Sequence, residues 1–193
     1  GAVITIQTAS NIDAAWIPRY VVGFTARQSV ILEFSPTIIS LILAGKVGSS
    51  IAAEIGTMRV KEQIDALDIM GVNSAGYLIL PKIIAAMLIN PFLIVISMFL
   101  SIFGGWVVCV ATGVVSPNEY ISGLQWDFDP FTVTYALIKT VVFAFAITSV
   151  AAYHGYFTQG GALEVGRSST TAVVFSSIVI LIANYMLTQL LLV

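Results

Sequence analysis

Residues 77–115 read YLILPKIIAAMLINPFLIVISMFLSIFGGWVVCVATGVV, an apolar run whose single formal charge is Lys82. A helix needs about 20 predominantly apolar residues, within a range of about 17–25, to cross the hydrocarbon core of a bilayer. This run is therefore long enough to span a membrane and too long for one straight span. Pro91 and the pair Gly104–Gly105 are the positions at which we expect it to kink or break.

Three further apolar runs follow the same pattern, at about Tyr20 to Ala44, Phe131 to Tyr153 and Ser168 to Val193. Of the 193 residues, 58% are hydrophobic and 9% are charged, whereas ordinary soluble domains carry about 25% charged residues. The runs are continuous rather than alternating, which argues against the short strands of a membrane β-barrel. We predict an all-α integral membrane protein, a polytopic bundle of about four to five membrane helices. The short apolar stretch Gly1 to Ile6 is expected to be the end of a truncated first helix.

Basic residues predict the orientation, because cytoplasmic loops carry an excess of Lys and Arg. Segment 45–76 holds Lys46, Arg59 and Lys61, and Lys82 lies just beyond it, whereas residues 116–130 hold no basic residue. We therefore expect segment 45–76 to be cytoplasmic, and residues 116–130 and the C-terminus to lie on the other side. Arg19 falls on that other side and fits this orientation poorly.

The chain carries no recognisable catalytic motif. Gly45-Lys46 has the look of a phosphate-binding loop, but Ser40 stands where that loop needs its first Gly, and Val47 where it needs Ser or Thr. Neither Gly-x-Ser-x-Gly nor His-Glu-x-x-His occurs. Cys109 alone provides no disulfide or metal cluster, and no basic patch indicates nucleic acid. We expect a non-catalytic chain with no cofactor and no metal, so that any nucleotide hydrolysis belongs to a partner.

The stretch from Lys46 to Asp68, KVGSSIAAEIGTMRVKEQIDALD, reads as one amphipathic helix. Its charged side chains gather on one face: Glu54, Lys61, Asp65 and Asp68, with Glu62 at the edge. Its apolar side chains gather on the opposite face: Ala53, Val60, Ile64 and Leu67. A helix that binds anionic lipid favours Lys and Arg on its polar face. This face is mainly acidic, which favours docking of a soluble partner over a connector that lies on the membrane surface.

The same segment contains an ordered series of short motifs: Ala44-Gly45-Lys46, Ala52-Ala53-Glu54-Ile55-Gly56-Thr57-Met58-Arg59-Val60, Glu62-Gln63-Ile64-Asp65-Ala66-Leu67 and Met70-Gly71-Val72. Together they resemble the signature of the MCE-associated ABC transporter permease family, the MlaE/YrbE-like proteins. The helix pattern extends this resemblance over almost the whole chain. It implies one permease domain over residues 1–193 in a bacterial inner membrane, with an N-terminal part missing and a periplasmic C-terminus.

The resemblance also implies partners and a function. Permeases of this family are expected to form homodimers and to pair with a cytoplasmic ABC ATPase, while a periplasmic MCE-domain protein sits on the outer side. The implied substrate is phospholipid or another hydrophobic lipid, which moves between the inner and outer membranes. Segment 45–76 would be the cytoplasmic coupling segment, and its ATPase-coupling residues would be Glu54, Arg59, Lys61, Glu62, Asp65 and Asp68.

Glu33 lies about midway along its apolar run, where family members commonly carry Arg-Glu-x-Gly-Pro and this chain has Leu32-Glu33-Phe34-Ser35-Pro36. A charged residue at the centre of a membrane helix costs about 2.5–3.5 kcal/mol on an insertion scale. Two interpretations stay open: Glu33 and Pro36 belong to the lipid pathway or its gate, or Glu33 makes a structural hydrogen bond between helices. Lys139 is a candidate partner, whereas Arg27 is expected to extend toward the membrane surface.

Two other functions stay open at this point. A secondary transporter driven by protons through Glu33 is one, although such folds often contain inverted repeats and none is visible in this sequence. A membrane scaffold or intramembrane enzyme is the other, although no convergent catalytic set supports an enzyme. Co-purification of an ATPase would separate the ABC permease from both.

Overall fold

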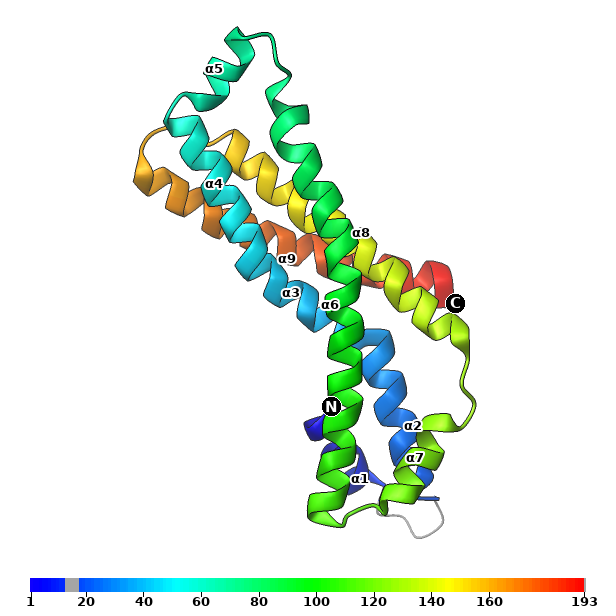
Figure 1. Ribbon diagram of the computed structural model, residues 1–193. Coiled ribbons are helices and arrows are strands. Elements are labelled where there is room, and N and C mark those ends of the chain that lie inside the picture. Colours follow the sequence, from blue (N-terminus) through cyan, green and yellow to red (C-terminus); the bar gives the residue numbers. More distant parts are fainter. Residues whose placement is uncertain (13–17, 193) are drawn as a thin grey trace. The chain divides into compact units, whose positions relative to one another are not determined.

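The computed structural model describes residues 1–12 and 18–192, and every regular element among them is a helix (Figure 1). This confirms the predicted all-α class. With η marking π-helical stretches, the elements in chain order are α1 (Ala2–Asn11), α2 (Tyr20–Ser29), η1 (Val30–Ile38), α3 (Ile39–Leu43), η2 (Ala44–Gly48), α4 (Ser49–Val60), α5 (Gln63–Ile69), α6 (Ser74–Thr112), α7 (Pro117–Gln125), α8 (Pro130–Tyr156) and α9 (Ala162–Leu192).

Among the described residues, four helices are long and apolar enough to cross a membrane: Tyr20–Val60, Ser74–Thr112, Pro130–Tyr156 and Ala162–Leu191. They correspond to the four apolar runs and confirm a multi-pass membrane protein. The second run does not break, because α6 stays helical through both Pro81 and Pro91. Membrane helices tolerate proline where neighbouring groups and local adjustments satisfy the freed backbone carbonyls.

The first of these helices extends well beyond its apolar run. It continues for 41 residues from Tyr20 to Val60, about twice the number of residues that one span requires. The hydrocarbon core of a bilayer is about 30 Å thick. The π-helical stretch η1 surrounds Pro36, whose ring and missing N–H disfavour a regular α-helix. The helix is therefore longer than a single span requires, and its charged residues follow the apolar run.

The chain forms two compact units, Gly1–Pro36 with Phe92–Leu137 and Thr37–Pro91 with Ile138–Val193. In the first unit, α7 packs on α2. A capping box starts α7, because the Ser116 hydroxyl accepts the Glu119 N–H and the Glu119 carboxylate accepts the Ser116 N–H. Burial raises the pKa of the Tyr120 hydroxyl in this helix. The buried core of this unit consists of Ala9, Val22, Ala26, Cys109, Val115 and Tyr120.

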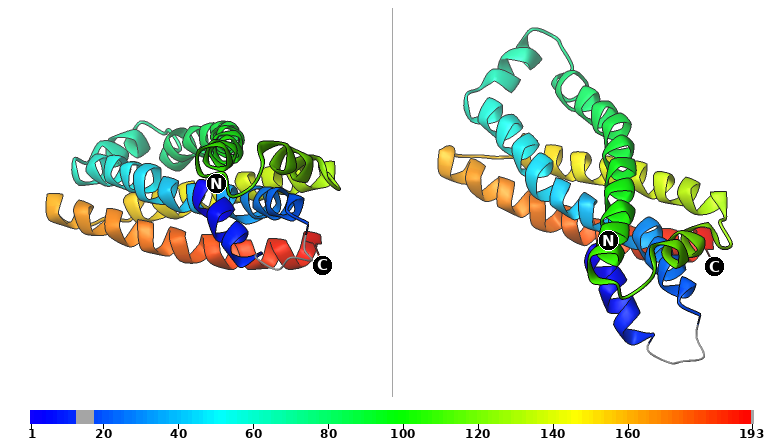
Figure 2. Two further views of the ribbon diagram at one scale, coloured as in Figure 1. Left: turned by 90° about the horizontal axis from the view of Figure 1, so that it is seen from below. Right: turned by 60° about the horizontal axis from the view of Figure 1, so that its bottom comes forward.

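In the second unit, α4 lies along α9, and α8 packs against the same core (Figures 1 and 2). Small and branched apolar side chains build this core: Ile51, Ala52, Ile55, Ile64, Ala151, Ala152 and Ala172. A second cluster continues along the same helices: Ala44, Phe143, Ile147 and Ile180. The core therefore holds α4 and α5 to two of the membrane-spanning helices.

Glycine allows α4 and α8 to approach each other closely. A Cβ atom on Gly155 would lie 2.7 Å from the carbonyl oxygen of Ala52 and 3.0 Å from the Cβ of Ile55. Gly56 on α4 faces Thr158, whose Oγ1 would lie 3.2 Å from an added Cβ. Small residues at helix contacts are typical of packing in lipid, where close backbone approach replaces the hydrophobic effect as the source of affinity.

We expect Gly155→Ala to destabilise the second unit by about 1–3 kcal/mol, because the added methyl group would overlap the backbone of α4. Thermal unfolding of the purified protein in detergent measures the effect. Gly166→Ala on α9 is the matched control, since no atom lies within 4 Å of its added Cβ and the substitution favours a helix by up to about 1 kcal/mol. Equal melting temperatures for the two variants would contradict this account of the packing.

Candidate functional site

The polar segment forms a bent pair of helices, so the predicted single helix from Lys46 to Asp68 is wrong. α4 ends at Val60 and α5 begins at Gln63, and Glu62 between them has a left-handed backbone with φ of 59°. The Glu62 N–H donates to the Arg59 carbonyl at 3.0 Å, which closes a tight turn. A left-handed residue cannot continue a right-handed helix, so the chain changes direction at this point.

The bend also changes which side chains are buried. On α4 the buried residues are Ile51, Ala52, Ile55 and Gly56. Ala53 and Val60, which were predicted to form the apolar face, are only half-buried. On α5 the prediction holds better, because Ile64 is fully buried and Leu67 is half-buried. Ile64 therefore anchors a seven-residue helix that is otherwise largely exposed.

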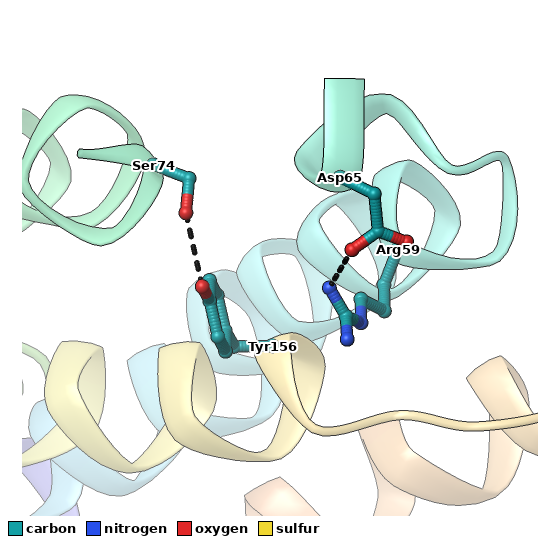
Figure 3. A network of polar contacts seen from close by, with 4 residues as sticks. All are labelled: Arg59, Asp65, Ser74 and Tyr156. Atoms are coloured by element: carbon teal, nitrogen blue, oxygen red, sulfur yellow. Dashed lines mark hydrogen bonds and ion pairs between the residues drawn. The ribbon is translucent and has the colours of Figure 1, made fainter. Parts of the chain in front are cut away.

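Polar contacts join α4, α5, α6 and α8 near this bend (Figure 3). The Arg59 guanidinium donates to the Asp65 carboxylate at 2.6 Å, across the turn between α4 and α5. The same guanidinium lies 5.7 Å from the ring centroid of Tyr156 on α8, within the range of a cation–π interaction. The Tyr156 hydroxyl lies 2.9 Å from the hydroxyl of Ser74, the first residue of α6. The network thus ties the turn to both α6 and α8.

A second ion pair joins α4 to α6. The Lys82 ammonium lies 2.7 Å from the Glu54 carboxylate. Exposed pairs of this kind contribute about 0.2–1 kcal/mol each, so Glu54 and Lys82 guide the relative placement of the two helices more than they stabilise them. Glu54 was predicted to contact a partner, and in this structure its carboxylate binds a helix of the same chain.

The outer surface of α5 combines acidic and apolar side chains. Lys61, Glu62, Asp65 and Asp68 are all exposed. Immediately after them, Ile69 is 87% exposed and Met70 is 68% exposed. Gly71 with φ of 78° then turns the chain toward α6. The charges were predicted from the sequence and this apolar pair was not, although two large apolar residues directly before a turn glycine are a readable signal.

The structure places Glu33 and Pro36 in η1, apart in sequence from the α4–α5 bend and within the other compact unit. Glu33 is half-buried and Pro36 is buried. Lys139 on α8 is completely buried in the second unit. A role for Glu33 and Pro36 in a lipid pathway stays a prediction.

Arg27 was expected to extend toward the membrane surface, and the structure shows its side chain buried within the first unit. Its guanidinium donates to the carbonyl oxygens of Leu124 at 2.6 Å, Trp126 at 3.0 Å and Asp127 at 3.1 Å. The aromatic rings of Phe24 and Phe128 lie 5.2 and 5.4 Å from the guanidinium carbon. A cation at the last carbonyls of a helix is favourable, so Arg27 fixes the end of α7.

Comparison with known proteins identifies the family. The model of the family described as "Permease MlaE" matches residues 1–190. A probable ABC transporter permease protein of Rickettsia bellii is 39% identical over 190 residues, which cover 98% of this chain and 73% of the relative. The chloroplastic protein TRIGALACTOSYLDIACYLGLYCEROL 1 of Arabidopsis thaliana is 35% identical over 98% of this chain and 54% of its own length. The intermembrane phospholipid transport system permease protein MlaE of Haemophilus influenzae is 31% identical over 86% of this chain and 64% of its own length. This chain belongs to the MlaE permease family.

Proposed function

We propose that this chain is the membrane-spanning subunit of an ABC transporter for phospholipid, and that a cytoplasmic ATPase drives it by docking on α5. The observation that carries the proposal is the form of α5, a short helix anchored at its base and exposed at its tip. Membership of the MlaE family supports the permease role, and the name of the Haemophilus relative supports phospholipid as the substrate.

The surface chemistry of α5 suits a protein partner better than a membrane. Its exposed charges are mainly acidic, whereas helices that lie on anionic lipid carry Lys and Arg on their polar face. Ile69 and Met70 form an apolar tip beside the carboxylates of Glu62, Asp65 and Asp68. Interfaces commonly concentrate their affinity in a few apolar anchors that enter a pocket. The complementary surface on the ATPase would be an apolar groove with a basic rim.

The base of α5 is built to transmit displacement. Ile64 is buried among the side chains that join α4, α8 and α9. The Arg59–Asp65 ion pair and the Ser74–Tyr156 hydrogen bond add links to α6 and α8. Packed interiors have low compressibility and transmit strain. A push on the tip is therefore passed to the membrane helices instead of being absorbed by the turn.

The distribution of basic residues supports a cytoplasmic position for α5. Lys46, Arg59, Lys61 and Lys82 all belong to this end of the second unit, and residues 116–130 contain no Lys or Arg. In this orientation the C-terminus is periplasmic. A periplasmic MCE-domain protein and a second copy of the permease complete the proposed assembly, in line with the family.

The energetics of lipid extraction favour an ATP-driven mechanism. Each methylene group of an acyl chain contributes about 0.8 kcal/mol to the affinity of a lipid for the membrane. Removing a two-chain lipid therefore requires an external source of free energy or an equally apolar receiver. Glu33 would also suit a proton-driven transporter, but the ABC permease names of several relatives support ATP hydrolysis in a partner.

The docking surface is tested by Ile69→Asp and by the double variant Glu62→Lys/Asp68→Lys. Neither Glu62 nor Asp68 belongs to the Arg59–Asp65 pair, so the double variant reverses surface charge and leaves that pair intact. We expect each variant to weaken ATPase binding by roughly 2 kcal/mol or more, as loss of an interface hot spot does. Co-purification and ATP turnover in phospholipid nanodiscs measure the effect. Ile69→Leu is the matched control and should bind normally. Normal binding and turnover in all variants would remove α5 as the docking element.

The transmission step is tested separately by Ile64→Ala. Truncation of a buried Ile costs about 2–5 kcal/mol, which is expected to loosen the base of α5 and leave its outer surface unchanged. Hydrogen exchange of residues 63–69 should accelerate, while ATPase co-purification persists and lipid transport per ATP falls. Ile69→Ala, at an exposed position, should leave the exchange of residues 63–69 unchanged. Unchanged exchange and transport in Ile64→Ala would show that the anchor is not needed for coupling.

A further inference from the structure

A groove with two chemically different halves lies between the C-terminal part of α8 and the N-terminal part of α9. The apolar half has a volume of about 440 Å³ and is lined by Val150, Tyr153, Phe175 and Val179, together with Ser149 and His154. The polar half has a volume of about 270 Å³, and its lining includes Gln159, Glu164, Arg167 and Thr171. Both halves share Tyr153 and His154, so they adjoin.

The wall between the two halves is held in place by rings and hydrogen bonds. The His154 ring lies 5.2 Å from the Phe175 ring in a stacked arrangement and 5.5 Å from the Tyr153 ring in an edge arrangement. The His154 carbonyl oxygen accepts hydrogen bonds from the hydroxyls of Thr158 at 2.8 Å and Ser168 at 2.6 Å. These contacts fix the end of α8 against the start of α9. The groove is therefore formed before any ligand enters it.

The polar half carries a replaceable ion pair. The Arg167 guanidinium lies 3.1 Å from the Glu164 carboxylate one turn away on α9, and both side chains are open to solvent. Exposed pairs of this type are weak, whereas guanidinium forms strong bidentate hydrogen bonds with phosphate. A phosphodiester can thus replace Glu164 on Arg167. Glu164 is then available to accept a hydrogen bond from an ammonium or hydroxyl group of the same ligand.

We propose that this groove binds one glycerophospholipid, with its phosphate on Arg167 and one acyl chain along Tyr153, Phe175 and Val179. The ligand needs an anionic group and a long apolar chain on one molecule, because the cation and the apolar lining belong to adjoining halves. The identification of this ligand rests on the proposed function. In the orientation proposed above, the groove opens to the cytoplasmic leaflet, since Tyr156 at the end of α8 contacts Ser74 beside α5.

A simpler explanation than a lipid-binding groove is that the exposed aromatic rings form an interfacial belt. Tyr153 and Phe157 lie near the expected membrane surface, where aromatic side chains commonly anchor helices. A belt does not require a hollow beneath the rings or an arginine at its mouth. Photolabelling distinguishes a lipid-binding groove from an interfacial belt, because the side chains of a belt contact all lipids alike.

The test uses the permease with its ATPase in phosphatidylcholine nanodiscs that contain a phosphatidylethanolamine with a diazirine in its acyl chain. After photolysis, mass spectrometry should map labels to residues 149–179. We expect Arg167→Gln to reduce this labelling about tenfold, as loss of a charge-assisted hydrogen bond predicts. Val179→Trp, which fills the apolar half, should remove it. Lys46→Gln and Val174→Trp are matched controls, because these exposed residues do not line the groove, and they should label as the wild type does.

Three outcomes would overturn the proposal. A diazirine-bearing diacylglycerol, which has no phosphate, would label the groove as strongly as the phospholipid if the contact were only that of bulk lipid. Soluble glycerophosphate would abolish labelling if the site took phosphate alone. A disulfide between two Val179→Cys chains without lipid labelling would assign the groove to a second copy. Labelling does not depend on α5, so a normal labelling pattern with no ATPase docking would refute the transporter mechanism and leave the lipid site standing.

Discussion

The thickness of the bilayer is the constraint on which the rest of this structure depends. An apolar core of about 30 Å is crossed by helices that include one of 41 residues and one of 39 residues. Their surplus length must leave the hydrocarbon, and the charged residues of α4 and α5 follow the apolar run at that end. In the proposed mechanism this extension acts as a lever, with its outer part in water and its inner part in lipid.

A lever transmits force only if its parts pack tightly, and lipid removes the usual driving force for that packing. Within a bilayer the hydrophobic effect does not favour contact between apolar helices. The second unit compensates with small residues, since Ala52, Ala151, Ala152 and Ala172 are all buried and Gly155 brings α8 onto the backbone of α4. Ile64 is the point at which this close packing reaches α5.

Hydropathy was sufficient to predict the four spanning helices, because the cost of exposing polar backbone to lipid leaves the chain few alternatives. It was insufficient for the α4–α5 bend, which depends on a left-handed Glu62 and an ion pair from Arg59 to Asp65. Helical periodicity therefore predicted the wrong buried face on α4. The position of Arg27 was equally unpredictable, since its partners are backbone carbonyls about 97 to 100 residues away. The local sequence pattern identifies the helices, and long-range contacts determine which of their surfaces are buried or exposed.

Two surfaces of the second unit, the tip of α5 and the groove between α8 and α9, suit different binding partners because their apolar side chains are arranged differently. At the end of α5, Ile69 and Met70 are largely exposed, which suits insertion into a rigid partner. Between α8 and α9, apolar side chains surround a hollow beside Arg167, which suits a flexible chain with a charged end. Tyr156 lies between these surfaces, since its ring faces Arg59 and its hydroxyl contacts Ser74. Tyr156 therefore links the α4–α5 bend to the end of α8, the helix that forms one wall of the groove.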